Sequence, residues 1–402
     1  MNNIALDGVK ILELCTMVAG PYCTKLMADL GAEVIKIEKT GSGDEARKRG
    51  PFLNDIPHPE KSLLFLNLNT NKLGITLDLG NRKGRWILRE LVKDADILVE
   101  DNSPGAMSEM GLGYDALKKL NPKLIMVSIT PFGQTGPYRY YRAHPLNMFH
   151  ASGEGYLTPA GDPYPDRPPL NIDNYVGEYA IGIYGAFAAA SALYWQRATG
   201  EGQYIDISRQ EALMSISALD VSQYPTTGEI PLRIHRGHIV GGIMPCKDGW
   251  VELSIYSESN WQGLVELFGN PDWAHYERFK EAPSRAENAK ELNQLIIESL
   301  MKMDKNDIYH RGQKLGIPAG IYFTAEDVFN SKQEKSRGFF HQLDHSQAGR
   351  LDYPTAPYKF SETPWQANRA APLLGEHNEG IYHRRLGYTK QELVRLRGLG
   401  VI

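Results

Sequence analysis

Short apolar runs alternate with helix-like patterns along the first third of the chain, and this alternation constrains the fold more than any other feature. Four runs have the length and composition of buried strands: 9–14, 33–37, 96–99 and 124–129. Between them, helical spacing of apolar residues marks 21–30, 82–93 and 114–120. Strands that alternate with helices predict a parallel sheet covered by helices on both faces. The sequence therefore predicts an α/β, Rossmann-like fold for this half of the chain.

Past residue 130 the pattern divides into a continuation of this unit and a second unit. A loop at 159–169 rich in Pro, Gly and Asp precedes a helix at 178–196, a strand at 204–208 and a helix at 210–218. A polar, turn-rich stretch at 224–231 is typical of a linker. Beyond it come a strand at 250–255 and helices near 260–268, 285–303 and 305–315, and then an extended, Pro-punctuated stretch with a last helix at 390–396. We therefore divide the chain into 1–224, the N-terminal part of a large Rossmann-like domain; 225–330, a small α/β domain; and 331–402, a C-terminal segment that returns to the large domain.

The charge balance and cysteine content argue against several classes of protein. The 402 residues carry 44 Lys and Arg against 48 Asp and Glu, and no basic stripe stands out, so nucleic acid is not an expected partner. The 3 cysteines have neither disulfide-framework nor metal-ligand spacing, which fits a reducing cytoplasm. No signal-peptide pattern is evident, and the small-apolar run at 180–193 contains two glycines and is typical of a buried helix. We expect a cytoplasmic protein with no membrane partner and no metal site.

Eight short motifs occur along the chain, and together they carry more information than any one alone. In order they are VAGP at 18–21, GAEVIKIE at 31–38, GSGD at 41–44, NLN at 67–69 followed by Lys72, DNSPG at 101–105, FGQTGP at 132–137, TGEGQ at 199–203 and APLLGEH at 371–377. The GxGxxG fingerprint of dinucleotide-binding proteins is absent. The series resembles the class III CoA-transferases, the CaiB/BaiF superfamily that includes formyl-CoA transferase, carnitine CoA-transferase and alpha-methylacyl-CoA racemase.

This resemblance implies a fold, an assembly and a reaction. Members look like interlocked ring homodimers, in which each chain builds a large Rossmann-like domain from both of its ends and a small domain from its middle. The implied reaction moves CoA from an acyl-CoA donor to a small carboxylic acid. CoA is then a substrate, and no permanently bound cofactor is implied.

The resemblance also implies a catalytic carboxylate at the start of the helix that precedes the TGEGQ turn. Counting back from that turn with the family's spacing reaches Glu178, with Gly182 four residues later, where the family has Asp. Asp173, five residues upstream, is the alternative. A carboxylate can attack the thioester carbonyl to give a mixed anhydride, from which the CoA thiolate makes an enzyme–CoA thioester. Without the resemblance, a carboxylate here would be a helix N-terminal residue that complements the helix dipole.

His144 is the second candidate catalytic residue. It follows the FGQTGP loop, and in the racemase branch a His at a similar place pairs with the carboxylate as two-base machinery. Histidine suits proton transfer near neutral pH. The competing functional hypothesis is therefore an acyl-CoA racemase or isomerase that acts at the alpha carbon through His144 and Glu178. A loop histidine that only hydrogen-bonds the backbone is the structural alternative.

Several positions match the family's CoA-binding segments. They are Val18, Ala19, Lys39, Asn69, Lys72, Asp101, Asn102 and Ser103, with Arg47 as a further cation. Backbone N–H groups and one or two cations are sufficient to hold phosphates in such a site. Because the net charge is slightly negative, phosphate binding must depend on these local groups. For Arg47 and its neighbours, a solvated charge run is the alternative.

Overall fold

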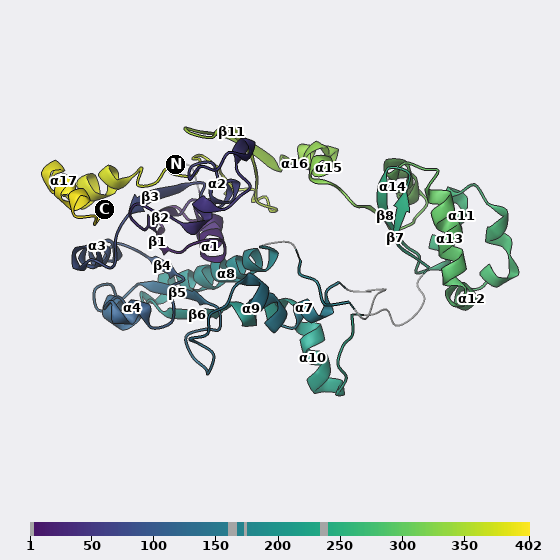
Figure 1. Ribbon diagram of the computed structural model, residues 1–402, viewed down its shortest axis with the longest axis horizontal. Coiled ribbons are helices and arrows are strands. Elements are labelled where there is room, and N and C mark those ends of the chain that lie inside the picture. The colour runs from purple at the N-terminus through teal and green to yellow at the C-terminus, as the bar shows by residue number, and fades with distance from the viewer. Residues whose placement is uncertain (1–3, 160–166, 173–174, 234–239) are drawn as a thin grey trace. The chain divides into compact units, whose positions relative to one another are not determined.

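The computed structural model describes residues 4–159, 167–172, 175–233 and 240–402. The chain forms two compact units (Figure 1). The first unit holds the described residues of Met1–Pro159, Arg167–Pro231 and Gly338–Ile402, so it contains both ends of the chain. The second unit holds the described residues of Leu232–Arg337. Each unit has its own hydrophobic core.

A six-stranded sheet forms the centre of the first unit. Its strands are β1 (Lys10–Leu14), β2 (Glu33–Glu38), β3 (Lys72–Thr76), β4 (Ile97–Glu100), β5 (Ile125–Thr130) and β6 (Tyr204–Ser208). They are arranged in the order β3-β2-β1-β4-β5-β6, and every neighbouring pair is parallel (Figure 1). The predicted α/β fold with a parallel sheet is confirmed. This order reverses between β1 and β4, which is where ligands bind in open α/β sheets, beyond the carboxyl ends of the strands.

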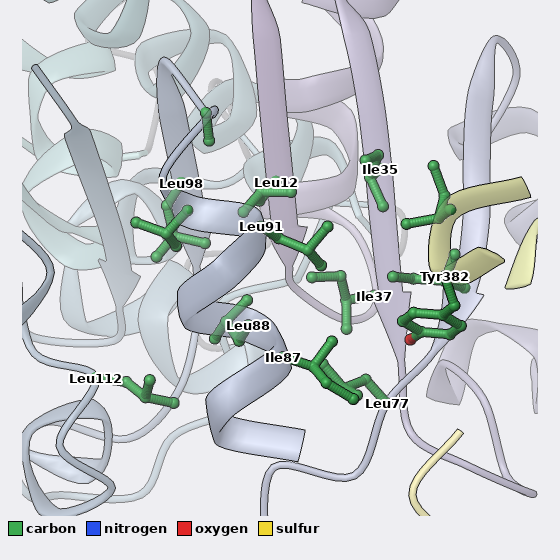
Figure 2. Close-up of a cluster of buried hydrophobic side chains, with 14 of the residues drawn as sticks. Leu12, Ile35, Ile37, Leu77, Ile87, Leu88, Leu91, Leu98, Leu112 and Tyr382 are labelled. Carbon is green, nitrogen blue, oxygen red and sulfur yellow. The ribbon is translucent and has the colours of Figure 1, made fainter. Parts of the chain in front are cut away.

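The two faces of the sheet pack against different helices. Strand side chains alternate between the faces, so neighbours such as Ile11 and Leu12 belong to different clusters. Leu12 lies with the buried residues of α3 (Arg82–Val92) and α17 (Lys390–Gly398), and Figure 2 shows the part of this cluster around α3. Ile11 lies with those of α1 (Ala19–Ala28) and α8 (Val176–Thr199). Helices therefore cover both faces, as the pattern predicted.

Small residues let α8 approach α1 closely. A Cβ at Gly182 would lie 2.8 Å from the carbonyl oxygen of Ala19, and one at Gly185 would lie 3.1 Å from the sulfur of Cys23. Neither position has room for a side chain unless the helices move apart. Glycine at these positions therefore sets the packing of α8 on the helix that follows β1.

The α8 helix is long and apolar enough, by length and composition, to cross a membrane. Its inner face belongs to the core of the first unit, with Ile181, Ala189 and Leu193 buried. Its outer face carries exposed apolar side chains, including Phe187 at 71% and Tyr194 at 81% exposure. The predicted buried helix is therefore buried along one face only.

Further helices of the first unit connect the strands and extend past β6. They are η1 (Glu45–Lys48), η2 (Leu53–Asp55), α2 (Leu63–Leu68), α4 (Ala106–Glu109), α5 (Tyr114–Lys118), α6 (Pro145–Ala151), α7 (Glu154–Leu157), α9 (Arg209–Ile216) and α10 (Ala218–Thr227). The interpretation of 224–231 as a linker is wrong at its start, because α10 continues to Thr227 and ends at the left-handed Gly228. Polar residues at 222–227 lie on an exposed helix rather than in an irregular segment.

The C-terminal residues complete the first unit along β3. The amide of Asn71 donates to the carbonyl of Arg369 at 2.9 Å, and the amide of Thr76 donates to Oδ1 of Asn378 at 2.9 Å. The segment is less extended than predicted: it forms the hairpin β10 (Phe340–His345) and β11 (Gly349–Pro354), and a π-helix, η5 (Glu379–Arg385).

The second unit packs helices around a small antiparallel sheet. The sheet has the order β7 (Gly241–Cys246), β8 (Gly249–Ser254) and β9 (Ala319–Ile321). The helices are α11 (Glu258–Leu267), η3 (Asp272–His275), η4 (Glu277–Phe279), α12 (Ala282–Glu287), α13 (Ala289–Leu300), α14 (Lys305–Lys314), α15 (Ala325–Asn330) and α16 (Lys332–Arg337). The single helix predicted at 285–303 is wrong, because the chain breaks at Asn288, where φ is −102° and ψ is 19°.

Candidate active site

Four elements bring polar groups together at the carboxyl edge of the sheet. Glu178 is the third residue of α8, and Arg209 is the first residue of α9, directly after β6. Asp101 directly follows β4, and Thr16 lies just past the end of β1. Because parallel strands end at the same edge, the residues that follow β1, β4 and β6 meet there although they are far apart in the sequence, and the start of α8 adds Glu178.

An ion-pair chain joins them. Nη1 of Arg209 lies 3.1 Å from Oε2 of Glu178, and Nη2 of Arg209 lies 3.7 Å from Oδ2 of Asp101. The backbone amide of Thr16 donates to the same oxygen of Asp101 at 3.0 Å. Glu178 is only 3% exposed. Burial raises the pKa of Asp101 to about 7, against the opposing effects of Arg209 and the Thr16 amide. The guanidinium is therefore held between two carboxyl groups, one fixed on α8 and one fixed to the loop after β1.

Glu178 borders a small cavity of about 10 Å³, which is room for about one water molecule. Pro145, the neighbour of His144, lines the same cavity. His144 itself is exposed at the start of α6, where its backbone amide donates to Oδ1 of Asn147 at 3.1 Å. In the part of the chain that the structure describes, no hydrogen bond or ion pair joins the imidazole to Glu178. Asp173, the alternative carboxylate, lies outside the described residues.

A cavity of about 400 Å³, the switch-point cavity, lies at the point where the strand order reverses between β1 and β4. It is lined by Leu14, Cys15, Thr16, Ile37, Glu38, Lys39, Gly43, Asp44, Leu77, Asp78, Leu79, Gly80 and Asn102. Lys39 is exposed here, directly after β2. Ser103 lines a neighbouring cavity of about 470 Å³. Val18 and Ala19 are buried where α1 begins. Of the predicted CoA-binding side chains, Lys39 and Asn102 are thus brought to one cavity together with Thr16.

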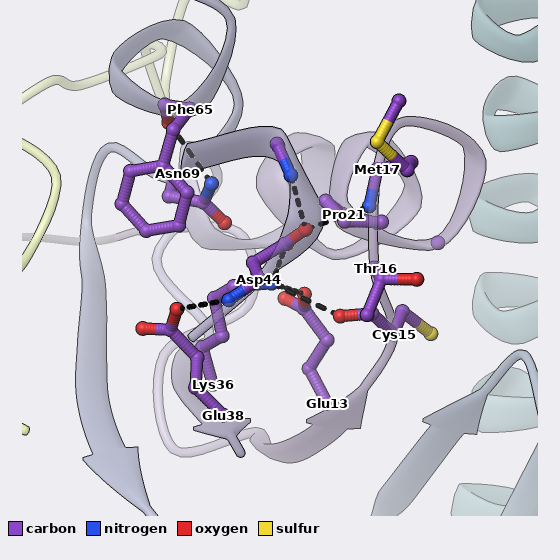
Figure 3. A network of polar contacts seen from close by, with 12 residues as sticks. Glu13, Cys15, Thr16, Met17, Pro21, Lys36, Glu38, Asp44, Phe65 and Asn69 are labelled. Carbon is purple, nitrogen blue, oxygen red and sulfur yellow. Dashed lines mark hydrogen bonds and ion pairs between the residues drawn. The ribbon is translucent and has the colours of Figure 1, made fainter. Parts of the chain in front are cut away.

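A buried network of charges supports the loop after β1 (Figure 3). Lys36 pairs with Oε1 of Glu13 at 2.7 Å and with Oδ2 of Asp44 at 2.8 Å, and Lys72 pairs with Oε2 of Glu13 at 2.8 Å. Nζ of Lys36 also donates to the carbonyl of Cys15 at 3.1 Å. Oδ1 of Asp44 accepts the amide of Met17 at 2.9 Å. The network therefore fixes the backbone from Cys15 to Met17, which forms one wall of the switch-point cavity.

Three predicted CoA ligands belong to the protein interior. Asn69 and Lys72 have no exposed surface, and Nζ of Lys72 donates to Oδ1 of Asn69 at 3.0 Å. Arg47 is 1% exposed, makes two hydrogen bonds to Glu38 and lies 3.6 Å from the centre of the Phe65 ring. None of these side chains is available to a ligand, because each is enclosed and paired within the protein. The alternative of a solvated charge is also wrong for Arg47.

The sequence did not single out Arg209 or Thr16. Arg209 has no local signal, since it is one arginine at the start of a short helix. Its position at the carboxyl end of a predicted parallel strand could have identified it, because such positions face the ligand edge of the sheet.

Comparisons with known proteins agree with this fold and identify the family. Residues 6–378 match the family model described as CoA-transferase family III. Succinyl-CoA–D-citramalate CoA-transferase of Chloroflexus aurantiacus is 32% identical, covering 99% of this chain and 98% of the relative. Succinate–glutarate CoA-transferase of Agrobacterium fabrum is 30% identical, covering 94% of each chain. The crystal structure of a CaiB/BaiF family protein from Brucella suis aligns with a TM-score of 0.86 at 31% identity, covering 95% of this chain and 99% of that one.

The chain therefore belongs to CoA-transferase family III and is an enzyme of the transferase type.

Proposed function

We propose that the enzyme moves CoA from an acyl-CoA to a carboxylic acid with Glu178 as the nucleophile. The carboxylate of Glu178 attacks the thioester carbonyl, and CoA leaves as the thiolate, which gives a mixed anhydride. The thiolate then adds to Cδ of Glu178 and expels the donor acid as its carboxylate, leaving an enzyme–CoA thioester. The acceptor carboxylate reverses these steps. The observation that carries the proposal is the buried Glu178 carboxylate at the start of α8, paired through one oxygen to Arg209.

The switch-point cavity is the proposed site for the nucleotide end of CoA. Lys39 supplies a cation there, and Thr16 and Asn102 supply polar groups. The backbone amide of Thr16 also donates to Asp101, which pairs with Arg209. Thr16 therefore connects this cavity to the ion-pair chain that includes Glu178. Ser103 lines the neighbouring cavity and extends the polar surface, whereas Val18 and Ala19 are buried where α1 begins and support the loop from beneath. Arg47, Asn69 and Lys72 then act as positioning residues beneath the loops.

Short dicarboxylic acids are the proposed acceptors. The names of three similar transferases include citramalate, glutarate and oxalate as the acid partner. A panel of CoA esters and free mono- and dicarboxylic acids, followed by chromatography of the CoA products, identifies the pair that this enzyme uses. Transfer to monocarboxylic acids only would contradict the proposed acceptor class.

The covalent intermediate tests the proposed function directly. The enzyme is incubated with the panel of acyl-CoAs and reduced with borohydride, which converts an enzyme–CoA thioester to an alcohol, and its peptides are mapped by mass spectrometry. We expect the mark on Glu178. A mark on Asp173 would assign the nucleophile to the other carboxylate, and no mark on either would contradict covalent transfer.

The alternative function is racemisation or isomerisation at the alpha carbon through His144 and Glu178. It draws on one observation, that Pro145 next to His144 lines the cavity beside Glu178. That reaction predicts exchange of the alpha proton of an acyl-CoA in deuterated water without any acceptor acid. The named relatives are transferases and favour CoA transfer.

We further propose that the two units are the large and small domains of a cytoplasmic homodimer. The exposed apolar side chains on α8 to α10, among them Phe187, Tyr194 and Leu219 at 83% exposure, form a surface suited to a second copy of the chain. Light scattering should give the mass of two chains of 45.0 kDa each. Phe187→Glu should shift the mass towards the monomer. Val394→Glu, on α17 over the opposite face of the sheet, should leave the dimer intact; a monomeric wild type would contradict the proposal.

A further inference from the structure

Arg209 contacts one oxygen of the Glu178 carboxylate, which is the nucleophile of the proposed mechanism. Nη1 of Arg209 lies 3.1 Å from Oε2 of Glu178, and among the described residues no hydrogen bond or ion pair joins Arg209 to the other carboxylate oxygen. Within the described part of the chain, Nε of Arg209 is buried and donates to nothing. The side chain is 17% exposed. The guanidinium thus has one donor engaged on Glu178 and further donor capacity at the site.

The charge of Glu178 changes during the reaction, whereas that of Arg209 does not. Free Glu178 carries one negative charge, and as a CoA thioester it carries none. The guanidinium then loses its nearer partner, and among the described residues it keeps Asp101, whose Oδ2 is 3.7 Å from Nη2. A largely buried cation without a close counter-ion is unfavourable and attracts an anion. The anion that must arrive next is the carboxylate of the acceptor acid.

We propose that Arg209 is a catalytic residue: it polarises the Glu178 carboxyl group during transfer and then receives the acceptor carboxylate. This inference rests on the proposed role of Glu178. When the CoA thiolate adds to Cδ, the carbonyl electron pair moves to Oε2, and Nη1 stabilises the resulting oxyanion. Collapse expels the donor acid with the other Glu178 oxygen and leaves Oε2 as the thioester carbonyl. The step needs no further reactant, and one negative charge is present on each side.

Asp101 orients Arg209 for both tasks. Its Oδ2 is fixed by the Thr16 amide, so the guanidinium has a partner that stays in place while Glu178 is acylated. Lysine at position 209 would place a single compact charge at the end of a shorter side chain. It could not contact Glu178 and Asp101 at the same time. The geometry therefore predicts that charge alone is insufficient at this position.

Rates of thioester formation test the inference. In single-turnover experiments with acyl-CoA, Arg209→Met is expected to slow formation of the Glu178 thioester by about 10²–10³-fold, the usual effect of removing one oxyanion donor. KM for acyl-CoA should change by less than about threefold, because the nucleotide end binds elsewhere. Arg209→Lys should fall between wild type and Arg209→Met. The KM for the acceptor acid should rise in both variants.

Two further measurements separate a catalytic role from a structural one. Added guanidinium should partly restore the rate of Arg209→Ala, which a merely misfolded site would not show. Arg197→Met, on the last turn of α8 with a 3.9 Å ion pair to Asp96, is the matched control and should keep the wild-type rate. Wild-type thioester formation on Glu178 together with an Arg209→Met rate within about threefold of wild type would overturn this inference and leave the proposed function standing. Wild type without a thioester on Glu178 would instead reject both.

Discussion

Glu178→Gln is expected to lower kcat/KM for CoA transfer by at least about 10⁴-fold, the order of loss seen when a covalent nucleophile is removed. The amide keeps the shape of the side chain but cannot attack a thioester as a carboxylate does. The borohydride mark should disappear with the activity. Transfer of CoA between an acyl-CoA and an acid, followed by chromatography, measures the loss.

Glu178→Asp is the matched variant, because it keeps the carboxylate and changes only its reach. Removing one methylene withdraws the reacting oxygen by about 1.5 Å, the length of a carbon–carbon bond. Displacements of this size cost about 10²-fold in a positioned site. We therefore expect activity to decrease in the order wild type, Glu178→Asp, Glu178→Gln. Full activity in Glu178→Gln combined with an inactive Asp173→Asn would assign the nucleophile to Asp173.

The sheet could be predicted largely from the sequence, with β3 as the instructive omission. Its sequence, KLGIT, begins with a charged residue and has a central glycine, so it lacks the apolar run that marks a buried strand. The glycine is required by a contact that is remote in sequence: a Cβ at Gly74 would lie 2.8 Å from the ring of Pro372. Local pattern cannot reveal such a constraint.

The burial of the charged residues around the candidate site could not be predicted from the local sequence either. Lys36, Lys72 and Arg47 would each be expected at the surface, since lysine and arginine are rarely buried unless paired. Their partners are provided by the fold: Glu13 comes from β1, and Lys36 and Lys72 come from the next two strands of the sheet. The family's spacing located Glu178, but only the strand order brings Arg209 beside it. Motifs thus identified positions, and the fold decided which of them face a ligand.

Glu13→Gln is expected to destabilise the first unit by about 3–5 kcal/mol, the usual result of breaking a buried ion pair on one side. Glu13 is fully buried and neutralises two fully buried lysines, Lys36 and Lys72. In the variant Lys36 keeps the carboxylate of Asp44, whereas the partners that the described residues leave to Lys72 are neutral, the carbonyl of Pro21 and the amide oxygen of Asn69. The urea midpoint of the sheet-containing unit measures the loss. Glu90→Gln, which breaks an exposed pair with Lys93, is the control and should cost less than about 1 kcal/mol.

A second substitution identifies the cause of that loss. Lys72→Met in the Glu13→Gln background removes the unpaired charge, so the double variant should recover much of the stability. No recovery would mean that packing around Glu13, rather than charge, accounts for the loss.

The pH dependence of stability gives an independent measure of the same pair. Burial alone would raise the pKa of Glu13, but Lys36 and Lys72 outweigh it and lower the pKa to about 2, from an ordinary value of 4.5. The folded state therefore binds fewer protons than the unfolded state between these values, and this stabilisation is lost as pH falls from 4.5 to about 2. Burial lowers the pKa of Lys72 to about 8 from 10.5, so the contribution of this group rises with pH across that window. Unfolding midpoints of Lys72→Met should lack the alkaline rise, and a rise as large as that of the wild type would show that another group titrates there.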